Sequence, residues 1–246
     1  VVTTINVDSA TIVDGFCITM GNASEFYQVY PDFVGGGWFD DGSGDDNGSF
    51  PTIINCNISG NRANGGGGLF CDGRFGGNSS PKLINCILSG NLGYANGGAI
   101  FSDANTGTSS PQLINCVVAG NLAYFYDGAA MYNSGVNGGV CVPNIINTIF
   151  WNNRAYQNGG TANSNVFHNN EAHPYVANSI LQGTSLNDLA TVTTVTTSGN
   201  NTDGGNNKFT APLFINSPIL VDDAATKAGN FNLLPGSPAV DMGQNG

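Results

Sequence analysis

The stretch that decides the fold is Pro51-Thr-Ile-Ile-Asn-Cys-Asn-Ile-Ser-Gly-Asn61, because close copies of it return along the chain. The copies begin at Pro81, Pro111, Pro143 and, more weakly, Pro174, so the spacings are 30, 30, 32 and 31 residues. A second block repeats out of phase with the first, as Gly66-Gly-Gly-Leu-Phe-Cys-Asp72, Gly97-Gly-Ala-Ile-Phe-Ser-Asp103 and Asp127-Gly-Ala-Ala-Met-Tyr-Asn133. A fixed period of this length indicates stacked copies of one small unit.

The repeating unit is made of strands. The chain holds 36 Gly, 10 Pro and many Asn, all poor helix formers. Short β-branched runs alternate with Gly-Asn, Asp-Gly and Gly-Gly turns, which is typical of short strands joined by tight corners. The sequence therefore predicts an all-β fold, a single-stranded right-handed parallel β-helix (a solenoid). We expect roughly eight coils of about 30 residues, stacked about 4.8 Å apart.

Stacking turns each repeated position into a column. One column is expected to be a corner with an asparagine ladder, because Asn tolerates left-handed backbone geometry: Asn55, Asn85, Asn115, Asn147 and Asn178. The next column holds small side chains and is expected to point inward: Cys56, Cys86 and Cys116, continued by Thr148 and Ser179. Two residues further on, the core face is predicted: Ile58, Leu88, Val118, Phe150 and Leu181.

For the strand after Gly-Gly the pattern leaves two registers open. Either Phe70, Phe101 and Met131 point inward, or Leu69, Ile100 and Ala130 do. Strand alternation allows only one of these sets to face the core.

The composition limits the partners. There are 17 acidic and 6 basic residues, giving a net charge of −11, and only 9% of residues are charged. This acidity argues against nucleic acid and against an anionic membrane surface. No apolar stretch approaches the roughly 20 residues needed to cross a bilayer. Low charge with abundant Asn, Ser, Thr and Gly favours a secreted, extracellular or cell-surface scaffold. Without an initiator Met or signal peptide, the chain is expected to be a processed product.

Six cysteines are present, but a disulfide framework is not the favoured interpretation. Three of them share one column, where parallel side chains do not suit pairing and one thiol would be left over. We expect buried free thiols that act as small hydrophobes. The pattern leaves any pairing among Cys17, Cys71 and Cys141 open.

The whole chain, residues 1–246, is expected to form one β-helix domain. Residues 1–22 are the entry coil, and residues 51–184 the regular coils. Residues 23–50 break the period and are expected to project as an aromatic and acidic insertion. Residues 185–246 hold irregular coils and a closing segment, with a threonine-rich strand at 191–197.

Several motifs resemble a known class. Asp14-Gly-Phe-Cys-Ile-Thr, the Asn-Cys-x-Ile-Ser-Gly-Asn repeats and Asn230-Phe-Asn-Leu-Leu-Pro-Gly-Ser-Pro-Ala-Val-Asp-Met-Gly243 are similar to right-handed parallel β-helix repeat proteins. These include the polymorphic outer-membrane-protein type. The resemblance covers most of the chain and implies a bacterial surface or secreted protein.

Candidate metal ligands lie in the insertion. Asp40, Asp41, Asp45 and Asp46 form an oxygen-rich loop of the kind that suits calcium, although a solvated acidic loop is favoured. Asp72 and Asp103 are expected on adjacent coils, where they could bind calcium or share a proton; Asx turns are favoured. His168 and His173 flank Glu171, but their spacing does not match the zinc-protease motif, which favours a surface loop.

The insertion aromatics are the best candidates for contact with a ligand or partner, namely Tyr27, Tyr30, Trp38 and Phe39. The alternative is that they cover the solenoid core. The first functional hypothesis is a non-catalytic extracellular structural or adhesive module, or a fibre subunit, whose partners are other copies, surface proteins or glycans. The alternative is a polysaccharide lyase or glycoside hydrolase on the same scaffold, although no basic cluster or catalytic motif is evident. An ice-binding threonine array is disfavoured because residues 191–197 do not repeat.

Overall fold

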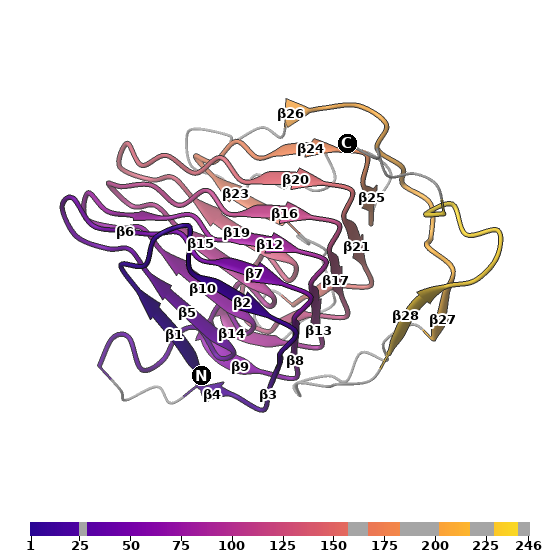
Figure 1. Cartoon of the computed structure of the whole chain (residues 1–246), viewed down its shortest axis with the longest axis horizontal. Coiled ribbons are helices and arrows are strands. Elements are labelled where there is room, and N and C mark those ends of the chain that lie inside the picture. The colour runs from indigo at the N-terminus through magenta and orange to yellow at the C-terminus, as the bar shows by residue number, and fades with distance from the viewer. Residues whose placement is uncertain (25–28, 157–166, 183–201, 217–228, 241–246) are drawn as a thin grey trace.

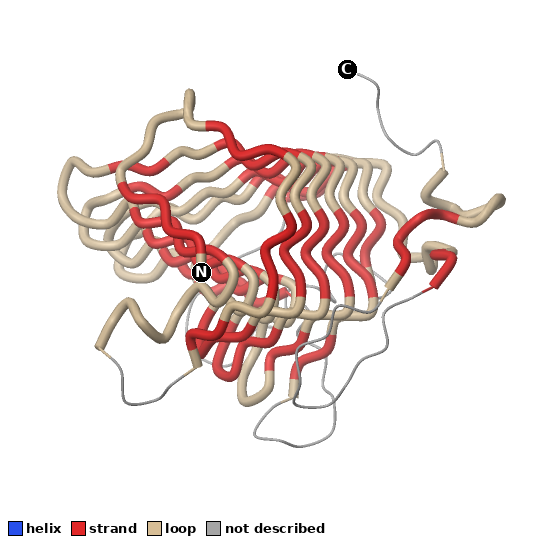
Figure 2. Tube along the Cα trace, turned by 60° about the horizontal axis from the view of Figure 1, so that its bottom comes forward, coloured by secondary structure: helices blue, strands red, loops and turns tan. Residues whose placement is uncertain are grey.

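The computed structural model is an all-β parallel β-helix (Figure 1). The structure describes residues 1–24, 29–156, 167–182, 202–216 and 229–240. Successive coils stack on one another, and the corresponding strands of the coils pair in the same sheet (Figure 2). Within the described part of the chain, no helix is long and apolar enough to cross a membrane.

Four parallel sheets run along the stack. Sheet 1 contains β1 (Val2–Ile5), β5 (Trp38–Asp41), β10 (Leu69–Asp72), β15 (Ile100–Asp103), β19 (Met131–Ser134) and β23 (Phe167–Asn170). Sheet 2 contains β2 (Ile12–Asp14), β7 (Thr52–Ile54), β12 (Lys82–Ile84), β16 (Gln112–Ile114), β20 (Asn144–Ile146), β24 (Tyr175–Ala177) and β26 (Thr202–Asp203).

The chain then turns through two further sheets before it returns to sheet 1. Sheet 3 contains β3 (Cys17–Thr19), β8 (Asn57–Ser59), β13 (Ile87–Ser89), β17 (Val117–Ala119), β21 (Ile149–Trp151) and β25 (Ile180–Leu181). Sheet 4 contains β4 (Asn22–Ala23), β9 (Arg62–Gly65), β14 (Leu92–Asn96), β18 (Leu122–Ala123) and β22 (Arg154–Ala155). A short pair, β6 (Gly48–Ser49) and β11 (Asn78–Ser79), lies between sheets 1 and 2 in chain order.

The predicted parallel β-helix is therefore present, but with fewer coils than expected. The largest sheet in the described residues has seven strands, whereas roughly eight coils were predicted. The difference arises in part because Phe214–Asn216 and Asn230–Leu233 pair with each other outside the parallel sheets, so they add no coil.

Each sheet turns one face inward, and the inward columns form the core. Sheet 2 contributes Ile53, Leu83, Leu113, Ile145 and Val176, and sheet 3 contributes Ile58, Leu88, Val118, Phe150 and Leu181, all with no exposed area. Full burial of each such side chain stabilises the fold by about 1.5–3 kcal/mol. Sheet 3 thus buries the side chains that the repeat assigned to the core.

The register of sheet 1 follows neither of the two alternatives left open above. Leu69 pairs with Ile100, and Ile100 pairs with Met131, and all three are buried inside the coil. The set that contained Leu69 and Ile100 was right for those two residues and wrong for Ala130. Both register steps are 31 residues, because the equivalent of Gly66 and Gly97 is Gly128 and not Asp127, so Met131 enters the column. Ala130 is also buried, one position before the column.

Glycines before the sheet 1 strands let neighbouring coils approach closely. A Cβ atom on Gly67 would lie 2.4 Å from the Leu92 carbonyl oxygen and 2.6 Å from that of Gly98. Because real Cβ atoms do not tolerate such contacts, the Gly-Gly motif is a packing requirement of this corner.

Residues 23–50 do not form the projecting insertion that was predicted. The strand β5 inserts between β1 and β10 in sheet 1, and Trp38 is fully buried in the main core. The sequence did carry the signal, because Gly35-Gly-Gly-Trp-Phe-Asp40 is a variant of the block at Gly66. This copy of the block was hard to recognise, because it has Asp40 in place of Cys71 and follows a stretch that has no counterpart in the other repeats.

The closing segment leaves the parallel stack. Here β27 (Phe214–Asn216) and β28 (Asn230–Leu233) pair in the antiparallel sense, and they lie to one side of the coils (Figure 1). The expected threonine-rich strand at 191–197 lies outside the described residues.

Candidate functional site

The outer face of sheet 1 brings together two columns with functional side chains. The first is aromatic and runs through Phe39, Phe70, Phe101, Tyr132 and His168, which are register partners on successive coils. The second is polar and lies two residues further along each strand, at Asp41, Asp72, Asp103, Ser134 and Asn170. Strand alternation places both columns on the same, outward face.

The early part of this face is closed by a compact ionic network. Arg74 Nε donates to Asp72 Oδ1 at 2.8 Å and lies 3.7 Å from Asp103 Oδ2. The Tyr30 hydroxyl donates to Asp72 Oδ2, and the Arg74 guanidinium lies 4.3 Å from the centre of the Tyr30 ring. Burial, together with the Asp72 charge, raises the pKa of Tyr30, so this hydroxyl stays protonated. These contacts fasten residues 29–34 over Phe39 and Phe70.

The polar column also builds the turns that follow the strands. Asp41, Asp72 and Asp103 each accept a hydrogen bond from the backbone N–H two residues later, at 3.0, 3.2 and 3.2 Å. These are the Asx turns that were favoured for Asp72 and Asp103. Asn133, which ends the third copy of the repeated block, points inward, and Ser134 follows Asp103 in the column.

The later part of the face carries a buried histidine, with His168 only 7% exposed. The His168 ring stacks parallel on the half-buried Tyr132 ring at 4.6 Å, with 2° between the planes. The carboxylate of Asp127 approaches His168 Nδ1 at 3.4 Å. An imidazole held in this way could bind an anionic or polar ligand group, or exchange a proton with one.

A second aromatic column lies at the end of sheet 4. Tyr94, Tyr124 and Tyr156 follow one another on successive coils, with ring centres 6.4 and 6.2 Å apart. Beside them Phe125 is 37% and Tyr126 is 55% exposed. Partly exposed aromatic rings in a row can stack on sugar rings or anchor a protein. The prediction missed this column, although Tyr stands three residues after Asn91, Asn121 and Asn153, the last residues of three successive corners.

The predicted calcium loop is not assembled as one site. Asp40 is fully buried and points inward, whereas Asp41, next to it on β5, points outward. Asp45 and Asp46 are exposed in the following turn. In the described ranges, no three His, Cys, Asp or Glu side chains lie close enough to hold a metal ion. The four-carboxylate site is therefore wrong, because strand alternation separates its first two members.

The predicted aromatic contact residues also divide. Trp38 is a core residue with no exposed area, and Phe39 is only 4% exposed beneath Tyr30. Tyr30 itself is half-buried in the network described above, and Tyr27 lies outside the described residues. Tyr30 and Phe39 thus cover the solenoid, as the alternative interpretation held, whereas Trp38 fills its core. Trp38 and Phe39 are not available to a ligand.

The structural columns occupy the corner between sheets 2 and 3. Asn55, Asn85, Asn115, Asn147 and Asn178 have left-handed backbone angles, with φ between +51° and +56°. Their amides connect neighbouring coils, for example Asn85 Nδ2 to Asn55 Oδ1 at 3.4 Å and Asn147 Nδ2 to Asn115 Oδ1 at 3.1 Å.

All six cysteines are free thiols; Cys17 is exposed, and the other five are buried. Burial raises the pKa of Cys141 to about 12, and also raises that of Cys71 and Cys116.

A second asparagine ladder, which the prediction missed, lies inside the corner between sheets 3 and 4. Its members are Asn61, Asn91, Asn121 and Asn153, each at most 2% exposed. Asn91 Oδ1 accepts from both Asn61 N and Asn61 Nδ2, at 3.0 and 3.1 Å, and Asn91 Nδ2 donates to Ile58 O and Asn121 Oδ1. The constant Asn at the end of each repeat was the available signal.

The histidine cluster expected around Glu171 is divided. His168 belongs to the outer face of sheet 1, whereas Glu171 and His173 line a separate cavity of about 590 Å³. This cavity lies where the turn 135–142 is followed by a shorter turn in the next coil. The three side chains therefore do not form one metal site.

Comparisons with protein-family models, curated proteins and solved structures give no match. The parallel β-helix itself is shown by the structure, whereas the family suggested by the motifs remains a proposal.

Proposed function

We propose that this chain is a non-catalytic structural or adhesive β-helix of a bacterial surface or secreted protein, which acts outside the cell. The observation that carries this proposal is that its chemically capable side chains are engaged in building the scaffold. Asp72 and Asp103 both lie within ion-pair distance of Arg74, and both form Asx turns. Asp40 accepts hydrogen bonds from hydroxyl groups inside the coil. Five of the six thiols are buried, which suits an oxidising environment.

The first coil supports self-association. Each of β1, β2, β3 and β4 lies at the edge of its sheet. The same coil exposes large apolar side chains, with exposed fractions of 58–75%: Val1, Ile5, Ile12, Phe16 and Met20. Edge strands offer unpaired backbone groups to another chain. The proposed partner at this edge is a coil of another copy or of a neighbouring surface protein.

Sedimentation velocity over a concentration series tests the assembly. We expect wild-type protein to form larger species as concentration rises, and the double variant Ile12→Lys, Phe16→Lys to remain smaller, because charges block edge pairing. Val140→Lys is the matched control, since Val140 is 51% exposed but lies away from this edge. A single monomeric species for the wild type at every concentration would contradict the proposal.

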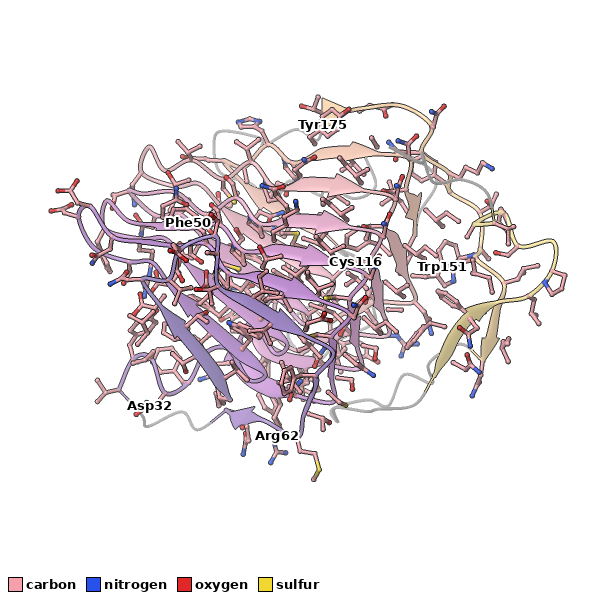
Figure 3. The ribbon with its side chains drawn as sticks, in the orientation of Figure 1. Asp32, Phe50, Arg62, Cys116, Trp151 and Tyr175 are labelled. Carbon is pink, nitrogen blue, oxygen red and sulfur yellow. The ribbon has the colours of Figure 1, made fainter. Side chains whose placement is uncertain are left out.

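The adhesive role is assigned to the tyrosine column of sheet 4, with glycans as the partner class. A glycan array probed with wild-type protein and with a Tyr124→Ala, Tyr126→Ala variant tests it. The control is Tyr175→Ala, at an exposed ring on sheet 2 (Figure 3). We expect binding that the control retains and the double variant loses. Binding that survives in the double variant would remove the column from the proposal.

The alternative function, a polysaccharide lyase or hydrolase, is favoured by one observation, the Asp127–His168 pair beside Tyr132. Incubation with neutral and uronate polysaccharides, followed by assays for reducing ends and unsaturated products, distinguishes the two. Activity that His168→Ala abolishes, with the fold intact by circular dichroism, would establish the enzyme. No turnover with any polysaccharide supports the structural role.

A further inference from the structure

A carboxylic acid is enclosed inside the solenoid. Asp40 belongs to β5, is 0% exposed, and stands in an inward column of sheet 1 between Thr4 and Cys71. It thus lies at the junction between the first coil and the coils that follow. Charged side chains are almost never buried without a partner, so this position needs an explanation.

Three hydroxyl groups surround the Asp40 carboxyl group at short distances. Asp40 Oδ1 accepts from Thr4 Oγ1 and from Ser49 Oγ, both at 2.6 Å. Thr4 Oγ1 in turn accepts from Trp38 Nε1 at 2.8 Å, which leaves its own hydrogen for Asp40. The hydroxyl groups come from three different segments, so one carboxyl group ties them together.

The contact with Ser79 shows where a proton can reside. Ser79 Oγ lies 2.6 Å from Asp40 Oδ2 and 3.1 Å from the Asp40 backbone oxygen. A hydroxyl has a single hydrogen, so it makes at most one full donation to these two oxygens. If Asp40 is protonated, Oδ2 donates to Ser79 Oγ, and Ser79 donates to the backbone oxygen, so every hydrogen has an acceptor.

The charges around Asp40 favour the protonated form. Among the described residues of the surrounding strands, β1, β6 and β11 contribute no titratable side chain. The neighbouring titratable groups are Asp41, on the same strand, and Cys71, on the next coil, and both are acids. Burial, assisted by the Asp41 charge, raises the pKa of Asp40, although the three hydroxyl groups oppose this. An unpaired buried charge would cost several kcal/mol.

We propose that Asp40 is held as a neutral carboxylic acid that fastens the first coil to the next two coils, and that loss of its proton loosens the first coil. The folded-state pKa lies above the unfolded value, so this stabilisation is fully present below the unfolded pKa of about 4 and is lost as pH rises through the folded value. The inference does not depend on the proposed function, since it concerns how the first coil is held.

The substitution Asp40→Asn tests the protonation state, because an amide has the shape of the neutral acid, carries no charge and offers a donor beside an acceptor. Its oxygen can accept from Thr4 and Ser49, and its N–H can donate to Ser79. We expect Asp40→Asn to be at least as stable as wild type at every pH. The rival hypothesis is an ionised Asp40 that accepts hydrogen bonds from all three hydroxyl groups. In that case Asp40→Asn would be less stable than wild type at low and high pH alike, and that result would overturn the proposal. The control is Asp41→Asn, which changes the neighbouring outward carboxylate.

Hydrogen exchange by mass spectrometry locates the effect. The ratio of wild-type to Asp40→Asn exchange rates for residues 2–5 cancels the intrinsic pH dependence. We expect a ratio near one at low pH that rises by up to about tenfold per pH unit above the folded pKa. The ratio for residues 87–89, in the middle of the stack, should stay near one. A flat ratio for residues 2–5 would overturn the proposal.

Infrared spectroscopy of the wild type gives a readout that does not require the variant to fold. As pH rises above about 4, ordinary Asp and Glu side chains lose their protonated carboxyl band, so a band that outlasts theirs in a pH series reports a raised pKa. Burial also raises the pKa of Asp103, and Asp103→Asn therefore serves as the second variant. A band that persists in Asp103→Asn supports the proposal, and a spectrum without such a band overturns it.

Discussion

The two asparagine ladders use the same residue for opposite reasons. In the outer ladder the backbone is left-handed, with φ of +53° at Asn85, and the Asn85 side chain is exposed. In the inner ladder Asn91 is 1% exposed, and the left-handed position belongs to the preceding Gly90, with φ of +58°. The outer column therefore needs Asn for its backbone, and the inner column needs the amide itself.

The two interior members of the inner ladder, Asn91 and Asn121, use both donor positions and both acceptor positions of their amides. Asn121 shows the pattern: its Oδ1 accepts from Asn91 N and Nδ2, and its Nδ2 donates to Leu88 O and Asn153 Oδ1. Such a network stabilises a core when complete and destabilises it when one member is removed. The comparison predicts that equal substitutions in the two ladders have unequal effects.

The largest effect is expected for Asn91→Asp. The new carboxylate would face Ile58 O and Asn121 Oδ1, which are both acceptors, and it would be buried without a cation. We expect a loss of about 3–5 kcal/mol near neutral pH. Burial would raise the folded pKa of this acid, so part of the stability should return as pH falls.

Chemical denaturation at neutral and mildly acidic pH measures this, with Asn85→Asp as the matched control. The side chain at position 85 is exposed, so the free energy of unfolding of Asn85→Asp should vary little between the two pH values. Equal pH dependence in both variants would contradict the distinction between the ladders.

A smaller loss is expected for Asn91→Ala. It leaves the Asn61 backbone N–H, the Asn61 side-chain amide and the Ile58 carbonyl without their partner. At about 1–3 kcal/mol for each buried unsatisfied group, we expect a loss of about 3 kcal/mol, since water can reach part of the gap. Thermal and urea unfolding measure this, and a loss below about 1 kcal/mol would show that the ladder contributes little.

Thiol labelling sharpens the comparison, because a cysteine column lies between the ladders. Cys56, Cys86 and Cys116 are at most 1% exposed and should resist labelling in the native protein, whereas Cys17 should react at once. If labelling requires opening of the coils, a loss of about 3 kcal/mol in Asn91→Ala should speed it roughly 100-fold. Rapid labelling of all three thiols in the wild type would contradict the core assignment.

The smallest effect is expected at the outer ladder. Asn85→Ala places alanine, which rarely adopts left-handed backbone angles, at φ of +53°. We expect the free energy of unfolding to fall by about 1–2 kcal/mol. Asn85→Gly should be nearly neutral, because glycine adopts this geometry without strain. Urea unfolding of the pair checks this, and equal losses for Ala and Gly would mean that the side-chain ladder, not the backbone, decides the choice of Asn.

Much of the scaffold could be predicted from repetition. The 30-residue period implied stacked coils, and the columns of Asn85, Cys86 and Leu88 implied a corner followed by a core strand. The candidate site was harder, because its parts come from different positions of the repeat. Tyr30, Asp72 and Arg74 meet only because a non-repeating segment folds back over the coils.

Residues 23–50 show why pattern alone was insufficient. The aromatic and acidic composition suggested a projecting loop, yet Trp38 fills the core and Asp40 binds three hydroxyl groups. Composition reports average polarity, whereas burial depends on which neighbouring coil presents a matching group. Ser49 and Ser79 do lie one 30-residue period apart and pair between β6 and β11, whereas Thr4 comes from the first coil, 36 residues before Asp40. The period therefore signalled the serine column, but not that it faces a buried carboxyl group.

The sequence by itself determined the stacking of coils, the parallel strands and the corner asparagines, because these depend on one residue type returning at one period. Tertiary structure alone decided which face Met131 enters, how Arg74 joins two coils, and which asparagines are exposed or buried. The physical reason is that periodicity defines neighbours along a column, whereas burial and hydrogen bonding also depend on contacts between columns, which only the closed coil creates.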